Sequence, residues 1–147
     1  MSGWHAKPLF DVPTIDPEEP SDPVWHPLQH HLRMTAFGAN AYVAAESGLN
    51  LLEAHDETKS GQEELYVVVS GAALFTLDGE DVDAPAPFVV AVLDPAVTRA
   101  AVSVEPGTTV LAFGGEPRKG FESSWSGRWF RSVPRAGDGR TRPNPSD

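Results

Sequence analysis

The residues with the clearest capacity for chemistry gather in one stretch, EAHDETKSGQEELYVVVSG, at residues 53–71. His55 and Glu57 are two positions apart, so a strand would place both side chains on one face. An antiparallel hairpin can then bring Glu64 opposite them. One imidazole and two carboxylates on one inner face suit a divalent transition metal such as Mn, Fe, Ni or Zn. Gln62 is an optional neutral fourth ligand.

The strand that carries Glu64 also carries a tyrosine in the same register. Because side chains alternate along a strand, Tyr66 shares the inner face with Glu64, whereas Glu63 points outward to solvent. A tyrosine at such a position can fill the interior and present its hydroxyl to a ligand. Packing alone also explains it, and both roles stay open at this point.

The surrounding chain predicts the elements that position these residues. From about residue 30, short apolar runs alternate with turn residues, and Asp78-Gly79 is the strongest short hairpin signal. About nine strands at spacings of roughly 8 to 12 residues, with no helical period between them, predict an all-β sandwich or barrel. The predicted strands cover residues 31–38, 40–46, 49–57, 64–70, 72–77, 80–84, 88–94, 98–104 and 108–114.

The two ends of the chain differ in composition from this central region of residues 28–115. Residues 1–27 are rich in proline and acids, which predicts an irregular N-terminal arm, neither helical nor part of a central strand. Residues 116–134 are expected to form a C-terminal cap with one short helix, and residues 135–147 a disordered tail. The cap helix would carry its aromatic side chains on one face: Phe121, Trp125 and Trp129.

Composition excludes several classes of protein and site. The 147 residues carry a formal net charge of −10, which disfavours nucleic acid as a partner because phosphate binding needs a basic surface. The absence of cysteine excludes disulfides and thiolate metal sites. No stretch approaches the roughly 20 apolar residues of a membrane span, and the N-terminus lacks the apolar core of a signal peptide. We therefore expect a cytoplasmic protein that does not contact a membrane.

The pattern His55-x-Glu57-x6-Glu64-x6-Gly71 resembles the first motif of the cupin superfamily, G-x5-H-x-H-x3,4-E-x6-G. His55, Glu64 and Gly71 match it. The resemblance covers about residues 30–115, and the stretch from Glu63 to Glu80 also looks like the small single-domain bacterial cupins. It implies a double-stranded β-helix, that is, a jelly-roll barrel, with a metal or ligand site in its interior.

The chain departs from the family pattern at positions that would bind the metal. Glu57 replaces the second histidine, and the turn that leads to Glu64 is longer than usual. The last histidine of the family falls on Arg99 if Ala96 is aligned with the family glycine, or on Ala100 if the preceding proline is used. Arginine is protonated and offers only donors, so Arg99 cannot be a ligand. Two hypotheses follow: three residues bind a metal by themselves, or the barrel is a metal-free pocket.

In the metal-free hypothesis, Arg99 neutralises the inner acids. It could also hold a substrate carboxylate through two hydrogen bonds. The resemblance thus predicts a protein that binds a small oxygenated metabolite, with Glu64, Arg99 and Tyr66 as catalytic candidates for an oxidoreductase, isomerase or lyase reaction. The alternatives are a non-catalytic module that binds or senses a metabolite and a structural dimer with a filled barrel.

The outward positions of the same strand predict a covered surface. Leu65, Val67 and Val69 form an apolar stripe on the face away from Glu64, where a solvent-exposed strand would carry polar residues. We expect a second copy of the chain to cover this stripe in a homodimer. Coverage by the N-terminal arm explains the pattern equally well.

Overall fold

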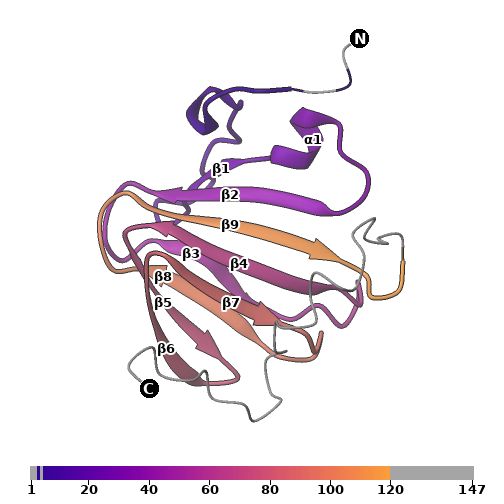
Figure 1. Ribbon diagram of the computed structural model, residues 1–147. Helices are drawn as coiled ribbons and strands as arrows, with labels where there is room; N and C mark the ends of the chain where they lie inside the picture. Colours follow the sequence, from indigo (N-terminus) through magenta and orange to yellow (C-terminus); the bar gives the residue numbers. More distant parts are fainter. Residues whose placement is uncertain (1–2, 4, 120–147) are drawn as a thin grey trace, which may run out of the picture.

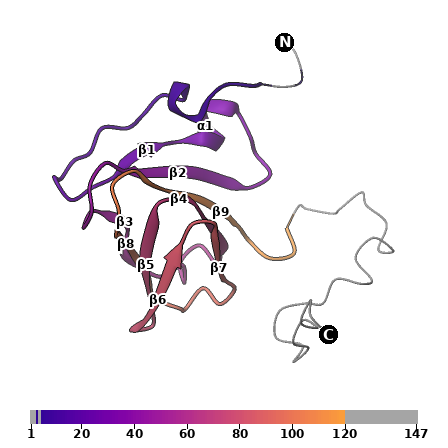
Figure 2. The same cartoon turned by 60° about the vertical axis from the view of Figure 1, so that its left-hand side comes forward.

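The computed structural model describes residue 3 and residues 5–119 of the chain, and this part folds into nine strands in two antiparallel sheets (Figure 1). The first sheet has the order β1-β2-β9-β4-β7 and the second the order β3-β8-β5-β6. The sheets face each other and enclose the interior, as the rotated view makes clear (Figure 2). The strands are β1 Val24–His26, β2 Gly38–Ala44, β3 Asn50–His55, β4 Glu63–Ser70, β5 Ala72–Leu77, β6 Glu80–Pro85, β7 Phe88–Val92, β8 Arg99–Ser103 and β9 Thr108–Gly115.

The predicted all-β barrel is confirmed, but the strand predicted for residues 31–38 is wrong. The short helix α1, Leu28–Leu32, begins directly after Pro27 and ends where Arg33 adopts a left-handed conformation with φ 60°. The side chain of Gln29 accepts a hydrogen bond from the backbone N–H of Ala39 at 3.0 Å, which ties the helix to β2. Proline at the start of a helix loses no hydrogen bond, so the sequence there favours a helical turn.

The N-terminal arm is more ordered than its proline content predicts. Val24–His26 form the edge strand β1, which pairs with β2 and lies between Pro23 and Pro27. A short 3-10 turn, η1, covers Leu9–Asp11. His26 is buried and makes a hydrogen bond through Nδ1 to the carbonyl of Val12 at 3.0 Å, so it ties the segment around Val12 to β1.

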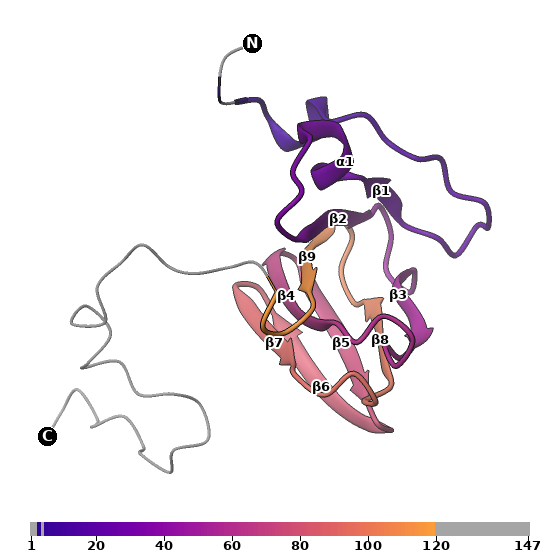
Figure 3. The same ribbon diagram turned by 90° about the vertical axis from the view of Figure 1, so that its right-hand side faces the viewer.

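The arm and α1 lie over the outer side of β2, as two views agree (Figure 3). Farther along the same sheet, the predicted apolar stripe is open: Leu65 is 40% and Val69 is 45% exposed, and Val89 on the neighbouring strand β7 is 63% exposed. The described part of the arm therefore does not cover the stripe. The homodimer stays a prediction.

The remaining expectations for the chain ends concern residues that are mostly not described. Residues 116–119 form a turn after β9, and the predicted cap helix and tail lie outside the described residues from position 120 onward. In the part of the chain that the structure covers, no helix has the length and apolar character required to cross a membrane.

Two turns explain why the strands reverse where they do. Asp78 and Gly79 have φ of 48° and 81° and join β5 to β6 as a two-residue hairpin, as predicted. Gly71, the last residue of the motif, has φ 71° between β4 and β5. A Cβ atom at Gly71 would lie 2.7 Å from the Cα of Thr108, so both conformation and space require glycine there.

Replacing Gly71 should therefore lower the free energy of unfolding more than replacing another glycine of positive φ. Gly48 has φ 82° but open space around it. Gly48→Ala should therefore lower the free energy of unfolding only by the roughly 1–2 kcal/mol that a side chain costs in the left-handed conformation. Gly71→Ala should lose clearly more free energy of unfolding, because the backbone of Thr108 must move. Chemical denaturation of both variants measures the difference, and equal losses would contradict the close packing.

Candidate metal centre

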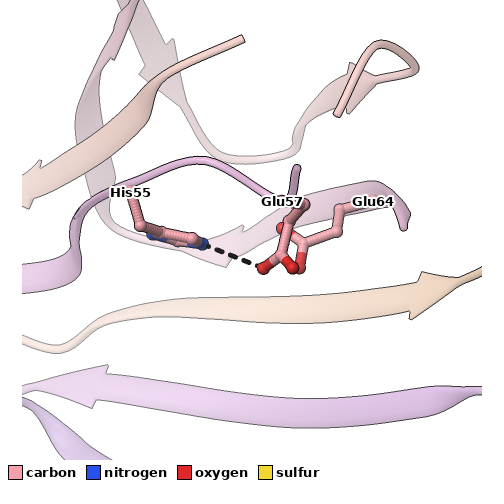
Figure 4. Close-up of side chains that lie close together, drawn as sticks. All are labelled: His55, Glu57 and Glu64. Carbon is pink, nitrogen blue, oxygen red and sulfur yellow. Dashed lines mark ion pairs between the residues drawn. The ribbon is translucent and has the colours of Figure 1, made fainter. Parts of the chain in front are cut away.

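Three ligand-type side chains converge at one end of the barrel interior (Figure 4). His55 is the last residue of β3, Glu57 lies in the loop that follows, and Glu64 lies on β4. One ligand atom from each lies within 4.8 Å of the others. The structure thus brings together the three residues that the motif predicted. The convergence depends on irregular backbone, because the pairing of β3 with β8 shifts register before His55 and Glu57 lies beyond the strand.

The imidazole of His55 is oriented by its own strand. Its Nδ1 lies 2.6 Å from the carbonyl oxygen of Glu53. A carbonyl only accepts hydrogen bonds, so Nδ1 carries a proton, and Nε2 is the nitrogen whose lone pair is available for a metal. Nε2 points to Glu57 and lies 3.4 Å from its Oε1 (Figure 4). This is the tautomer and orientation that a metal-binding histidine needs.

The loop after β3 fixes the second carboxylate. The backbone N–H of Glu57 donates to the carbonyl of Pro95 at 2.8 Å, and the carbonyl of Glu57 accepts from Gly61 at 2.7 Å. The hydroxyl of Ser60 donates to Oε2 of Glu57. Oε2 of Glu57 is therefore occupied by the hydrogen bond from Ser60, while Oε1 is directed toward His55. The longer turn thus holds the glutamate that stands in place of a histidine.

Arg99 points into the barrel and is fully buried. Its Nη1 lies 3.3 Å from Oε2 of Glu64, and its Nη2 donates to the carbonyl of Val97 at 2.9 Å. Further, longer hydrogen bonds reach the carbonyls of Asp94 and Pro95. Arg99 also pairs across the sheet with His55, so it occupies the position next to the site where the motif alignment placed it.

The surroundings of Glu64 raise the pKa of its carboxyl group. Burial is the largest cause and the nearby Glu57 carboxylate adds to it, while Arg99 and, to a smaller extent, His55 oppose the shift. Two carboxylates in a partly desolvated site resist ionising together unless a cation balances them. The site is therefore short of positive charge even with Arg99 in place.

A cavity of about 230 Å³ opens onto these residues. Gln62 and Tyr66 line it together with the three ligand-type residues, so every predicted site residue except Arg99 borders the same space. Arg99 lies behind Glu64 and is absent from the described lining. Gly114, the cross-strand neighbour of Glu64 on β9, lines the same wall, and a Cβ atom there would lie 2.8 Å from the side-chain oxygen of Gln62.

Two tyrosines, Tyr66 and Tyr42, border this cavity. Tyr66 is 1% exposed, and its hydroxyl is buried without a hydrogen-bond partner among the described residues. Burial, and secondarily the charge of Glu64, raise the pKa of Tyr42 to about 12. Tyr42 thus retains its proton at neutral pH. An unsatisfied buried hydroxyl costs free energy, so Tyr66 is poised for a polar partner that enters the cavity.

The donor set fits a divalent transition metal. One neutral imidazole and two carboxylates lie within reach of one ion, and three protein ligands leave further positions open for substrate or water. The arginine and the serine each bind one oxygen of a carboxylate, as outer-shell groups do around metal ligands. The ion would also relieve the charge repulsion that raises the pKa of Glu64.

Sequence reasoning missed the groups that hold the ligands. Ser60 lies inside a turn of ordinary composition, and the carbonyl oxygens of residues 94–97 carry no sequence signal. The spacing of Ser60 three residues after Glu57 is the one local hint, because a turn can bring such side chains together.

Comparisons with known proteins identify the fold. No family model matches the chain, and no curated protein matches its sequence. Among solved structures, a cupin protein from Bacteroides fragilis is similar with a TM-score of 0.64 and 14% identity, over 84% of this chain and 93% of that one. KdgF from Halomonas sp. is similar with a TM-score of 0.59 and 18% identity, over 75% and 91% of the two chains.

A third similar structure is a sugar phosphate isomerase of the cupin superfamily from Silicibacter pomeroyi. Its TM-score is 0.63 with 17% identity, over 76% of each chain. At these identities the similarity establishes the fold. The resemblance inferred from His55, Glu64 and Gly71 is thereby confirmed at the level of architecture.

Removing the buried arginine should destabilise the metal-free protein strongly. Arg99→Ala leaves Glu64 beside Glu57 without its partner and leaves several carbonyls unsatisfied, so we expect a loss of about 3–5 kcal/mol in the free energy of unfolding. Lys59→Ala in the exposed loop should change it by less than roughly 0.5 kcal/mol. Urea denaturation in chelator measures both. A loss in Arg99→Ala as small as that of the control would contradict the pairing.

The raised pKa of Glu64 predicts a pH dependence of the metal-free protein. The folded state holds the Glu64 proton more tightly than the unfolded chain, so this contribution to stability is present below the ordinary carboxyl pKa. It is lost as the pH rises through the raised pKa. Measured in chelator, the stability of the wild type should fall relative to Glu64→Gln over this range. If the wild type instead gained stability relative to Glu64→Gln as the pH rises, the pKa of Glu64 would be lowered in the folded protein, which would contradict this account.

Proposed function

We propose that this chain, which has the cupin fold, is a divalent-metal-dependent enzyme that transfers a proton on a small oxygenated metabolite. The observation that carries the proposal is the convergence of His55, Glu57 and Glu64 beside a cavity that is also lined by Tyr66, whose buried hydroxyl has no partner among the described residues. Metal binding, reaction and substrate are parts of this proposal. An isomerase or lyase reaction suits it best, because such reactions need proton transfer and polarisation of a carbonyl without an added oxidant.

The residues divide between holding the ion and handling the substrate. His55, Glu57 and Glu64 would hold the metal, and Gln62 can add a neutral oxygen from the same wall. The ion would supply Lewis acidity, which polarises a substrate oxygen. Arg99 acts as a positioning residue, since it is fully buried and touches Glu64 rather than the cavity.

Tyr66 is the best placed residue to contact the substrate. Its hydroxyl can donate a hydrogen bond to a substrate oxygen and take up a proton relay role there, because no described residue satisfies it. Tyr42 lies on the same cavity and keeps its proton to about pH 12, so it also serves as a neutral donor. These two hydroxyls and the carboxylates together suit a molecule rich in oxygen atoms.

The similar structures agree with this choice without deciding it. One of them is named a sugar phosphate isomerase, which is a proton-transfer activity on an oxygenated metabolite. The metal-free alternative draws support from Arg99, whose charge already balances part of the acidic site. In that case the cavity would bind its ligand without catalysis.

Metal content tests the proposal first. Untagged protein purified without chelator should contain close to one transition metal ion per chain, measured by elemental mass spectrometry. His55→Ala and Glu64→Gln should lose the ion because each removes a ligand, whereas Glu63→Gln should keep it because Glu63 is exposed on the other side of β4. Wild-type protein that stays metal-free after addition of Mn, Fe, Ni and Zn would reject the enzyme and favour the binding module.

The catalytic part is tested by solvent deuterium exchange. A panel of aldoses, ketoses and hydroxy acids in deuterated water should show enzyme-dependent incorporation of deuterium at carbon, detected by NMR. Tyr66→Phe should keep the metal and slow the exchange by about 10²-fold or more, the usual contribution of an acid or base. Exchange that is unchanged in Tyr66→Phe would remove the tyrosine from the proposed mechanism.

A further inference from the structure

A second cavity of about 380 Å³ lies beside the candidate metal centre, between the N-terminal arm and β3. Tyr42, Leu52 and His55 line both cavities, so the two spaces share a wall that includes a proposed metal ligand. The outer cavity is thus placed to receive the part of a substrate that extends away from the reacting atoms.

The arm forms the outer wall at a fixed position. The backbone N–H of Ile15 donates to the carbonyl of Trp25 at 2.9 Å, and the N–H of Asn50 on β3 donates to the carbonyl of Ser21 at 2.8 Å. The carboxylate of Asp22 accepts from the backbone N–H of Glu19 at 2.9 Å and closes the turn between these two attachments. These hydrogen bonds hold the arm in place, so the wall is a fixed part of the fold.

The lining of the outer cavity has one sign of charge. Four carboxylates border it, from Asp16, Glu18, Asp22 and Glu53, and no lysine or arginine does so among the described residues. The inner cavity adds Glu57 and Glu64 and likewise has no cationic side chain in its described lining. Arg99, the nearest arginine, is fully buried behind Glu64 and bonded to carbonyl oxygens.

Aromatic rings complete the outer wall. Trp25 is 38% exposed, and its ring centroid lies 6.4 Å from that of Tyr42. The indole Nε1 donates to the side-chain oxygen of Asn40 at 2.8 Å, which holds the ring in place. Indole and phenol faces attract cations, and neighbouring carboxylates strengthen that attraction. Phosphate and carboxylate groups would find only like charge here.

A second observation concerns the inner cavity, which shares Tyr42, Leu52 and His55 with the outer one. Tyr66 lines this inner cavity, and its buried hydroxyl has no hydrogen-bond partner among the described residues, so one hydrogen-bonding position is left for an incoming molecule. A ligand that reaches Tyr66 past Tyr42 and His55 would extend into the acidic, aromatic outer cavity.

We propose that the cavity between the arm and β3 is a subsite for an amine group of the substrate, so that the substrate is a small polyhydroxylated amine. This inference rests on the proposed function, because it assigns the substrate class of the same site. A phosphate in this outer cavity would find no cationic side chain to anchor it, because the described lining contains neither lysine nor arginine.

Binding of three compounds with one carbon skeleton tests the charge preference. D-Glucosamine, D-glucose and D-glucose 6-phosphate are titrated at low ionic strength and at a pH at which the amine is protonated. The readout is the indole Nε1–H resonance of Trp25, assigned by comparison with Trp25→Phe. Glucosamine should shift this resonance at the lowest concentration and the phosphate at the highest. Equal or tighter binding of glucose or its phosphate would overturn the proposal, as would the absence of a shift with glucosamine.

A double variant tests the acidic wall. Asp16→Asn with Glu53→Gln should weaken glucosamine binding by about fivefold and leave glucose binding unchanged, because exposed charges each contribute modestly. Glu80→Gln with Asp83→Asn on β6 removes the same charge from exposed positions outside both cavities. Equal weakening by both double variants would show a general charge effect and reject the subsite.

The two proposals fail separately. The titrations are repeated with chelated protein and with protein loaded with Mn²⁺. A glucosamine shift in a protein that takes up no metal would keep the subsite and reject the metal enzyme. Stoichiometric metal binding without selective binding of glucosamine would keep the metal enzyme and reject the amine subsite.

Discussion

The guanidinium of Arg99 is a full charge in the interior of a small barrel, and the surrounding structure compensates it. Burying such a charge is costly unless other groups pair with it and satisfy its donors. Glu64 supplies the opposite charge, and the carbonyls of residues 94–97 accept the remaining hydrogen bonds. The segment that leads into β8 is thereby fixed against β4. The N–H of Glu57 binds the carbonyl of Pro95 in that same segment, so the arginine also positions the loop after β3.

This arrangement reconciles the two hypotheses that the motif left open. Arg99 does balance an inner acid, yet it binds from behind the carboxylate and leaves the cavity side of the site to His55, Glu57 and Glu64. Burial and the neighbouring Glu57 still outweigh Arg99 in setting the pKa of Glu64. A buried arginine beside a metal ligand is thus compatible with an ion, and the remaining excess of negative charge favours one.

The motif spacing predicted the barrel and the convergence of three side chains because both follow from local rules. Strand alternation, Asp78-Gly79 and the conformation of Gly71 are encoded within a few residues. The sequence did not predict the helix at 28–32, the strand at 24–26 or the burial of His26, because these depend on docking against β2 and Val12. The acidic cavity also escaped notice, since it joins arm residues to β3 across about thirty positions of sequence.

Anomalous diffraction from crystals of the protein grown with Mn²⁺ would test the central claim most directly. The account predicts one strong anomalous peak within coordination distance of His55 Nε2 and of oxygens from Glu57 and Glu64, with Arg99 still bonded to the far oxygen of Glu64. A cavity without a peak, or a peak bound elsewhere while Arg99 occupies the space between the two glutamates, would contradict it. The barrel would then be a metal-free binding protein.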